Sequence, residues 1–148
     1  MTNPRGHGMS LAVRTVTRLT VGLILLYGIY IVLHGHVSPG GGFAGGVIIA
    51  LSFVHLMLAF GRETALRTLS ESRSVYVASV GAVLFLAIAV FGFIAGYFFF
   101  NFLGKGGPLP VLDAGTIPLS EISIALKVGG GLFAAAVALV LMRLEPEK

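Results

Sequence analysis

Two histidines, a Ser-Pro pair and a run of glycines stand together in the stretch HGHVSPGGGFAGG, residues 34–46. Imidazole titrates near neutral pH and is a common metal ligand, so His34 and His36 could carry protons or bind a metal. Residues two apart do not face the same way on a helix, and the stretch offers no Cys or carboxylate to complete a metal site. We therefore predict no metal site at these histidines.

The glycines of this stretch provide backbone freedom where a helix is expected to begin. Glycine adopts positive φ angles and lets backbones approach closely. We expect Ser38 to be the N-cap of the following helix and Pro39 its first residue. Irregular backbone at membrane depth persists only where it is buried in protein or lines a cavity. We thus interpret the stretch as a turn clamped by partners or lining water, with a flexible surface turn as the alternative.

Two more titratable residues lie within apolar stretches. Lys127 is expected about five residues into the last of them, roughly 8 Å from its outer end at 1.5 Å per residue. A charge there is costly and suggests a function, either in an ion or proton pathway or in an ion pair with a partner subunit. Snorkelling of the ammonium to the interface is the third reading. His55 could relay protons, but a hydrogen-bonded histidine between helices is the interpretation that we favour.

Acidic residues avoid the middle of every apolar stretch. They stand in predicted loops or at predicted helix ends, as Glu63, Glu71, Asp113 and Glu121 do. A cation carrier normally keeps an ionisable acid within its membrane spans, so we do not expect this chain to transport ions alone. Nothing in it resembles a nucleophile–base pair, a phosphate-binding loop or a nucleic-acid-binding patch. We predict neither an enzyme nor a cofactor.

The composition identifies the elements that must hold these residues. Hydrophobic residues make up 56% of the chain and charged residues 11%, and the mean hydropathy is +0.97. A soluble domain carries roughly 25% charged residues. We predict an all-α polytopic membrane protein with one integral membrane domain over residues 1–148. Its four transmembrane helices are expected at about 16–35, 42–61, 74–100 and 121–143.

Basic residues indicate how these helices are oriented. The predicted N-terminal tail and second loop carry three arginines each, and the C-terminal tail carries an arginine and a lysine. The loops on the opposite side carry Lys105 alone. The positive-inside rule therefore places both termini in the cytoplasm. The same rule explains the net charge of +4 without a nucleic-acid partner.

Small and polar residues at helical spacing predict where membrane helices pack, because lipid is as apolar as the side chains themselves. We expect such faces to contact other helices of the chain or partner subunits. The residues assigned to them are Gly45, Ser52 and Ala59 in the second stretch, Gly92 and Gly96 in the third, and Gly131 and Ala134 in the fourth, with His55 and Lys127 on the same faces.

The stretch HGHVSPGGGFAGGVIIA, residues 34–50, resembles the signature of the MnhB/MrpB family, the B subunits of Mrp-type multisubunit Na⁺/H⁺ antiporters. The short chain, the predicted spans and the later GGPLPVLDAGTIP stretch agree with it. The resemblance implies a subunit of a complex in a prokaryotic cell (inner) membrane that exchanges cytoplasmic Na⁺ for external H⁺. It assigns importance to the matching residues His34, His36, Pro39, Gly40, Gly41, Gly42 and Phe43.

The resemblance also implies partners and leaves alternatives. The expected partners are other membrane subunits, the lipid bilayer, and Na⁺ and H⁺ as transported ions. The main proton channels of such complexes belong to larger subunits, so this chain would contribute to assembly and to the ion path. Homologous subunits occur in membrane-bound hydrogenase-type complexes, which is one alternative. A purely structural membrane subunit is the other.

Overall fold

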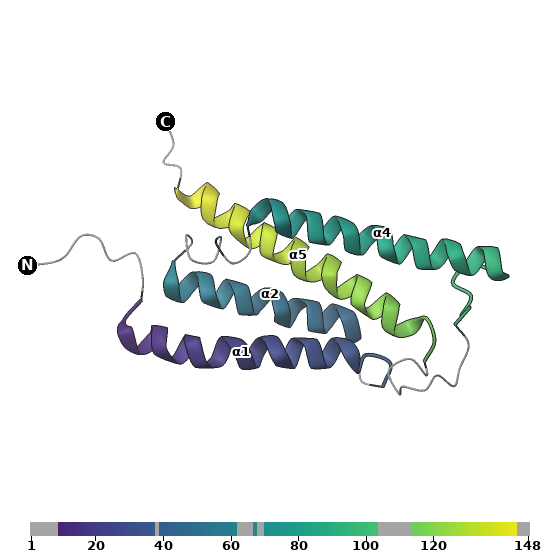
Figure 1. The fold of residues 1–148 in the computed structure, drawn as a ribbon. Coiled ribbons are helices and arrows are strands. Elements are labelled where there is room, and N and C mark those ends of the chain that lie inside the picture. Colours follow the sequence, from purple (N-terminus) through teal and green to yellow (C-terminus); the bar gives the residue numbers. More distant parts are fainter. Residues whose placement is uncertain (1–8, 38, 62–66, 68–69, 104–113, 145–148) are drawn as a thin grey trace, which may run out of the picture.

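The structure, a computed structural model, describes residues 9–37, 39–61, 67, 70–103 and 114–144. Within these ranges the chain is all-α, with helices α1 (Leu11–Leu33), α2 (Gly41–Phe60), α4 (Glu71–Ala95) and α5 (Ile117–Leu144) (Figure 1). All four are long and apolar enough to cross a membrane. The prediction of an all-α polytopic membrane protein with four transmembrane helices is confirmed.

The first, third and fourth helices differ from their expected bounds by more than one residue, and α1 begins five residues before the expected residue 16. α4 begins at Glu71, where the Ser70 hydroxyl accepts a hydrogen bond of 3.3 Å from the Arg73 N–H. It ends at Ala95 instead of residue 100, because the chain folds back and brings the Phe99–Phe100 backbone against Gly92. α5 begins at Ile117, not at residue 121, since Pro118 suits the first turn of a helix, where its missing N–H costs nothing.

The helices lie side by side in the order α1, α2, α5, α4, and α5 crosses the row diagonally (Figure 1). α1 packs on α2, α2 on α5, and α5 on α4, whereas α1 touches α5 only slightly. A row of this kind has two open faces, so it encloses little. Its buried apolar cluster consists of Met57, Phe133 and Val137. Only 17% to 33% of the apolar stretch of each helix is buried.

Glycines bring the helices of the row into backbone contact. A methyl group added at Gly45 of α2 would lie 2.8 Å from the Gly28 carbonyl oxygen of α1. One added at Gly130 of α5 would lie 2.9 Å from the Ala78 nitrogen of α4. Both distances are shorter than a carbon atom tolerates, so the absence of a side chain sets the spacing of these helices.

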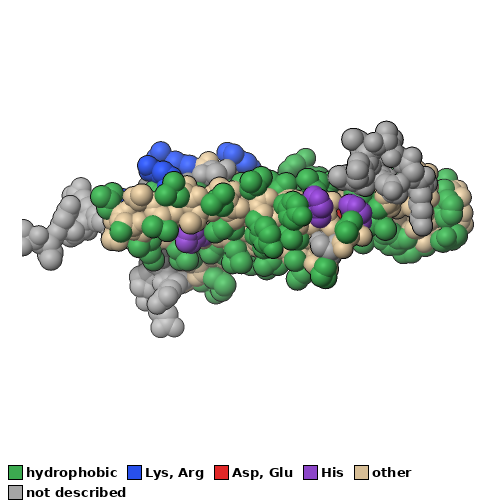
Figure 2. Space-filling view, turned by 90° about the horizontal axis from the view of Figure 1, so that it is seen from below, with side chains coloured by type: hydrophobic (Ala, Val, Ile, Leu, Met, Phe, Trp, Pro, Cys, Tyr) green, Lys and Arg blue, Asp and Glu red, His purple; other side chains and the backbone are tan. Residues whose placement is uncertain are grey.

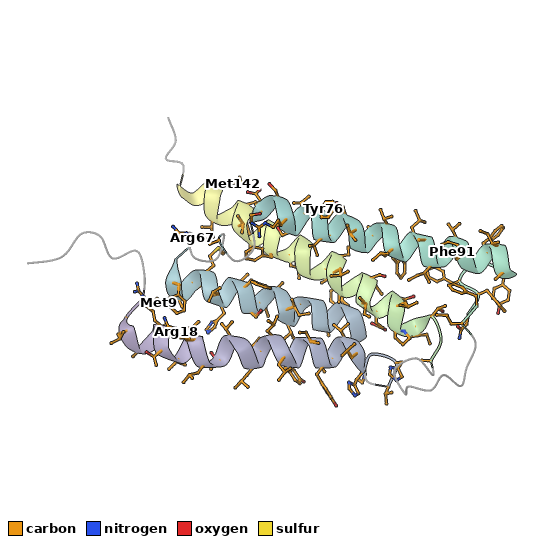
Figure 3. The ribbon with its side chains drawn as sticks, viewed as in Figure 1. Met9, Arg18, Arg67, Tyr76, Phe91 and Met142 are labelled. Atoms are coloured by element: carbon orange, nitrogen blue, oxygen red, sulfur yellow. The ribbon has the colours of Figure 1, made fainter. Side chains whose placement is uncertain are left out.

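The two ends of the row differ in charge. α1 begins and α5 ends at the same end of the molecule, where α2 also ends and α4 begins (Figure 1). Arg18 and Arg67 lie at this end (Figure 3). Figure 2 shows basic side chains gathered near one end of the visible face and apolar side chains along its length. The cytoplasmic position of this end stays a prediction.

Candidate functional site

The turn between α1 and α2, residues 34–42, lies at the end of the row opposite the arginines, and we call it the signature turn. His34 is the C-cap of α1, and its N–H donates a hydrogen bond of 3.0 Å to the Tyr30 carbonyl. The chain then reverses through Gly40 and Gly41, whose φ angles are 106° and 41°. These are left-handed values that glycine adopts far more readily than other residues.

This geometry corrects the expected start of α2. Gly40 is the N-cap and Gly41 the first helical residue, so Pro39 precedes the helix. Proline has a φ near −65°, so it could not supply the left-handed turn with which the helix begins. Ser38, the expected N-cap, lies outside the described residues.

Glu121 of α5 lies against the signature turn. Its carboxylate accepts a hydrogen bond from the backbone N–H of Gly42. A methyl group added at Gly35 would lie 2.9 Å from the carboxyl carbon, and one at Gly41 would meet the carboxylate itself. One at Gly42 would also meet the Glu121 carbonyl oxygen. The three glycines thus leave the space that the Glu121 carboxylate and backbone occupy.

The start of α2 explains why a carboxylate is stable in this place. A helix begins with unpaired N–H groups and a partial positive charge. α2 has no side-chain N-cap hydrogen bond and no acidic residue in its first turn. Glu121 supplies the missing anion from another helix, an interaction worth about 0.3–2 kcal/mol depending on burial. It therefore ties the start of α2 to α5.

The sequence predicts Glu121 at or near a helix end and indicates no role for it. The usable signal is the run Gly40–Gly42 just after the expected helix start, because these glycines have no side chain that could cap free N–H groups. Such a start needs an anion from elsewhere in the fold. Which acidic residue reaches the start of α2 is decided by the fold, and it is Glu121.

The histidines of the signature turn face different surroundings. The His34 ring stacks on Tyr30 with centroids 4.1 Å apart, and its Nδ1 lies 3.1 Å from the Tyr30 carbonyl oxygen. His36 is half-buried, and its Nδ1 has no hydrogen-bond partner within the described part of the chain. Phe43, at the start of α2, is 63% exposed and so is open to a neighbour. No group of three metal-ligating side chains occurs among the described residues.

His55 lies between α1 and α2, nearer the arginine-bearing end. Its Nε2 is 3.2 Å from the hydroxyl of Thr17, which is buried. This is the geometry of a hydrogen-bonded histidine between two helices. The pair joins α1 to α2. A role of His55 in proton relay stays a prediction.

Lys127 does not face the other helices of this chain. Its side chain is exposed, although its backbone packs against Gly81 of α4. Gly131, one turn further on, is also exposed, and a methyl group there would meet nothing within 4 Å. α5 instead packs on α4 through Gly130. Lys127 and Gly131 of the expected face therefore point toward lipid or a partner, whereas Ala134 of the same face is half-buried.

The other expected packing residues fall into two groups. Gly45, Ser52 and Ala59 are buried on α2, and Ala134 is half-buried on α5. Gly92 is buried, but against the Phe99–Phe100 turn rather than against a helix. Gly96 is exposed and is the C-cap that follows α4, which corrects its assignment to a packing face within the span.

An apolar cavity of about 360 Å³ opens between the helices. It is lined by aliphatic and aromatic side chains and by glycines, among them Ile29, Ile49, Phe53 and Gly129. None of the described side chains that line it is charged. The polar groups of interest lie at the two ends of the row and on the outer face of α5.

Comparison with known proteins identifies the family. Residues 12–142 match the model of a domain related to the MnhB subunit of Na⁺/H⁺ antiporters. The chain belongs to the MnhB family. A Na⁺/H⁺ antiporter B subunit from Bacillus subtilis is 35% identical, over 81% of this chain and 85% of that protein. The putative antiporter subunit mnhB2 of Staphylococcus aureus strain Newman is 34% identical, over 79% and 84%.

An archaeal relative of this MnhB-family protein is longer. An uncharacterized protein of Methanocaldococcus jannaschii is 38% identical over 85% of this chain, which spans 50% of that relative. The family and the four apolar helices together make the chain a multi-pass membrane protein of a prokaryotic cell. The matched region includes the signature turn and Glu121, so both belong to the family domain.

Proposed function

We propose that this MnhB-family protein is a small, non-catalytic subunit of a multisubunit antiporter that exchanges cytoplasmic Na⁺ for external H⁺. The observation that carries the proposal is the family match over residues 12–142, which leaves few residues unmatched at either end. The relatives named as antiporter subunits in Bacillus subtilis and Staphylococcus aureus cover most of the chain and support it.

The arrangement of the helices supports a role within a complex. A single row exposes two apolar faces, and large apolar side chains such as Leu26, Leu86 and Leu139 are more than half exposed. Lipid and neighbouring membrane subunits are the surfaces that such faces fit. Among the described residues, the acidic side chains Glu71 and Glu121 lie near the starts of their helices. The chain accordingly contributes to assembly and to the border of an ion path built with other subunits.

The signature turn gives this subunit a rigid end. Glu121 joins α5 to the start of α2, and the turn joins α2 to α1, so three helices are held together there. Phe43 is presented outward from this end, and the ring of His36 has an unused nitrogen. We assign these groups to contacts with a partner subunit or with water at the external surface of the cell membrane.

The test uses a host that lacks the gene for this subunit and the same host with the gene restored. Na⁺-driven proton movement is measured in inverted membrane vesicles, and the tagged protein is purified in mild detergent with its partners. We expect exchange to require the subunit and antiporter subunits to copurify with it. Copurification with nickel and iron–sulfur subunits would place it in a hydrogenase-type complex instead. Normal exchange without the subunit would contradict the proposal.

A further inference from the structure

Lys127 lies deeper in its helix than the sequence suggested. α5 begins at Ile117, so Lys127 follows its first residue by about 15 Å at 1.5 Å per residue. The apolar span of this helix runs from Ile117 to Val140, and Lys127 is near its middle. A cation at this level is costly when it faces acyl chains.

No group of this chain compensates the charge within the described residues. The Lys127 side chain is exposed and makes neither a hydrogen bond nor an ion pair there. Glu121 is the acidic side chain described on the same helix, but its carboxylate is held by the Gly42 N–H. Within the described part of the chain no free carboxylate is available to Lys127, which directs attention to an anion on another molecule.

The face around Lys127 is open to close approach. Gly131 and Ala135 follow at intervals of one helical turn, and both are exposed. A methyl group added at Gly131 meets nothing within 4 Å. By contrast, Gly129 and Gly130 are buried in the contacts of α5 with its neighbours. Small residues on an exposed face let another helix reach the backbone beside the charge.

We propose that the face formed by Lys127, Gly131 and Ala135 docks a transmembrane helix of another subunit, and that this helix carries an Asp or Glu at the level of Lys127. Charge complementarity selects this partner, because a carboxylate turns an uncompensated cation into an ion pair. The inference rests on the proposed function in that it needs a complex. Snorkelling of the Lys127 ammonium to a lipid phosphate at the membrane surface is the competing outcome.

The first experiment compares variants by the recovery of partner subunits per molecule of this protein in purified membranes. Lys127→Met removes the charge, Lys127→Arg keeps it, and Gly131→Leu fills the open face. Gly22→Leu is the matched control, since Gly22 of α1 is likewise exposed with nothing within 4 Å of an added methyl group. We expect Lys127→Met to lower recovery about tenfold or more, because a carboxylate left buried without its cation is strongly destabilising. Gly131→Leu should lower recovery by a similar factor, because the larger side chain keeps the partner helix from the backbone of α5.

The controls keep the result interpretable. Lys127→Arg should retain most of the recovery, and Gly22→Leu should match the unmodified protein. The amount of each variant in the membrane is measured alongside, so that failure to fold is recognised. Recovery of no partner by the unmodified protein would refute the proposed function itself. Normal recovery with Lys127→Met, or equal losses with Gly131→Leu and Gly22→Leu, would overturn the docking face.

The second experiment identifies the partner helix. The chain has no native cysteine, so Ala135→Cys can carry a single photoactivated crosslinker in the intact complex. We expect it to join a peptide from an apolar span that contains Asp or Glu. Lys127→Glu by itself should abolish the recovery of partner subunits. Changing the acid of the partner helix to Lys in the same complex should restore it. Crosslinks to lipid only, or to a span with no acid, would contradict the proposal.

Discussion

Glu121 organises the signature turn at the scale of a single residue. Its carboxylate performs, from a different helix, the task that Ser, Thr, Asp or Asn performs at an ordinary helix start. This arrangement explains why glycines occupy the positions around it, since any side chain at Gly41 or Gly42 would displace the acid. The signature turn is therefore best understood as one half of a contact whose other half is Glu121.

Substitutions of Glu121 should separate its charge from its hydrogen bond. Glu121→Gln keeps an acceptor for the Gly42 N–H but removes the negative charge, so we expect a loss of about 1 kcal/mol in unfolding free energy. Glu121→Leu also leaves the N–H unpaired, which should cost about 1–3 kcal/mol more. Unfolding of the purified protein in detergent measures both, with Glu71→Gln, an exposed first-turn acid of α4, as the control. Equal stabilities of all three variants would remove Glu121 from this role.

At the scale of the helices, glycine sets the distance between α1 and α2. Gly45 faces Gly28 and the Val32 side chain, whereas Gly22 on α1 faces open space. The same residue type thus has opposite consequences at the two positions. One glycine is required by a contact, and the other only lowers the helix propensity of α1.

Alanine at these two positions provides a matched prediction. Gly45→Ala places a methyl group 2.8 Å from the Gly28 oxygen, and overpacking of this kind costs about 1–3 kcal/mol. Gly22→Ala should stabilise the protein by up to about 1 kcal/mol, because alanine favours helix and meets nothing. Thermal unfolding followed by circular dichroism in detergent compares them. A melting temperature unchanged by Gly45→Ala would show that α1 and α2 can separate at little cost.

The molecule as a whole is a row of helices with a basic end and an end that carries the signature turn. α1 and α2 form one pair, α4 and α5 another, and α5 joins them by packing on α2. Neither face of the row is covered by other helices within the described residues. The orientation of the row in the membrane then decides which surface the signature turn meets.

Cysteine labelling tests that orientation. Val37 of the signature turn is 76% exposed, and Glu71 at the opposite end is also exposed. With the basic end in the cytoplasm, Val37→Cys should react with an impermeant thiol reagent in intact cells, and Glu71→Cys should react only after lysis. Because this chain contains no native cysteine, it contributes no background labelling. The reverse pattern would invert the topology.

The sequence by itself determined the membrane helices and the family. Hydropathy over some 20 residues is a local property, so it locates four spans without knowledge of their neighbours. The signature at residues 34–50 is likewise contiguous, and it identified the family that the comparison then showed. Its glycines made a left-handed turn foreseeable in kind, although α2 begins at Gly41, two residues after Pro39, its expected first residue.

Only the tertiary structure decided which faces meet. Glu121 reaches Gly42 across 79 positions of sequence, and no local pattern records that distance. The rotation of α5, which buries Gly130 and exposes Gly131 and Lys127, was equally hidden. The physical reason is that lipid and protein interiors are both apolar, so hydrophobicity does not mark the packed side of a membrane helix. Backbone proximity and the partners of a few polar groups decide it instead.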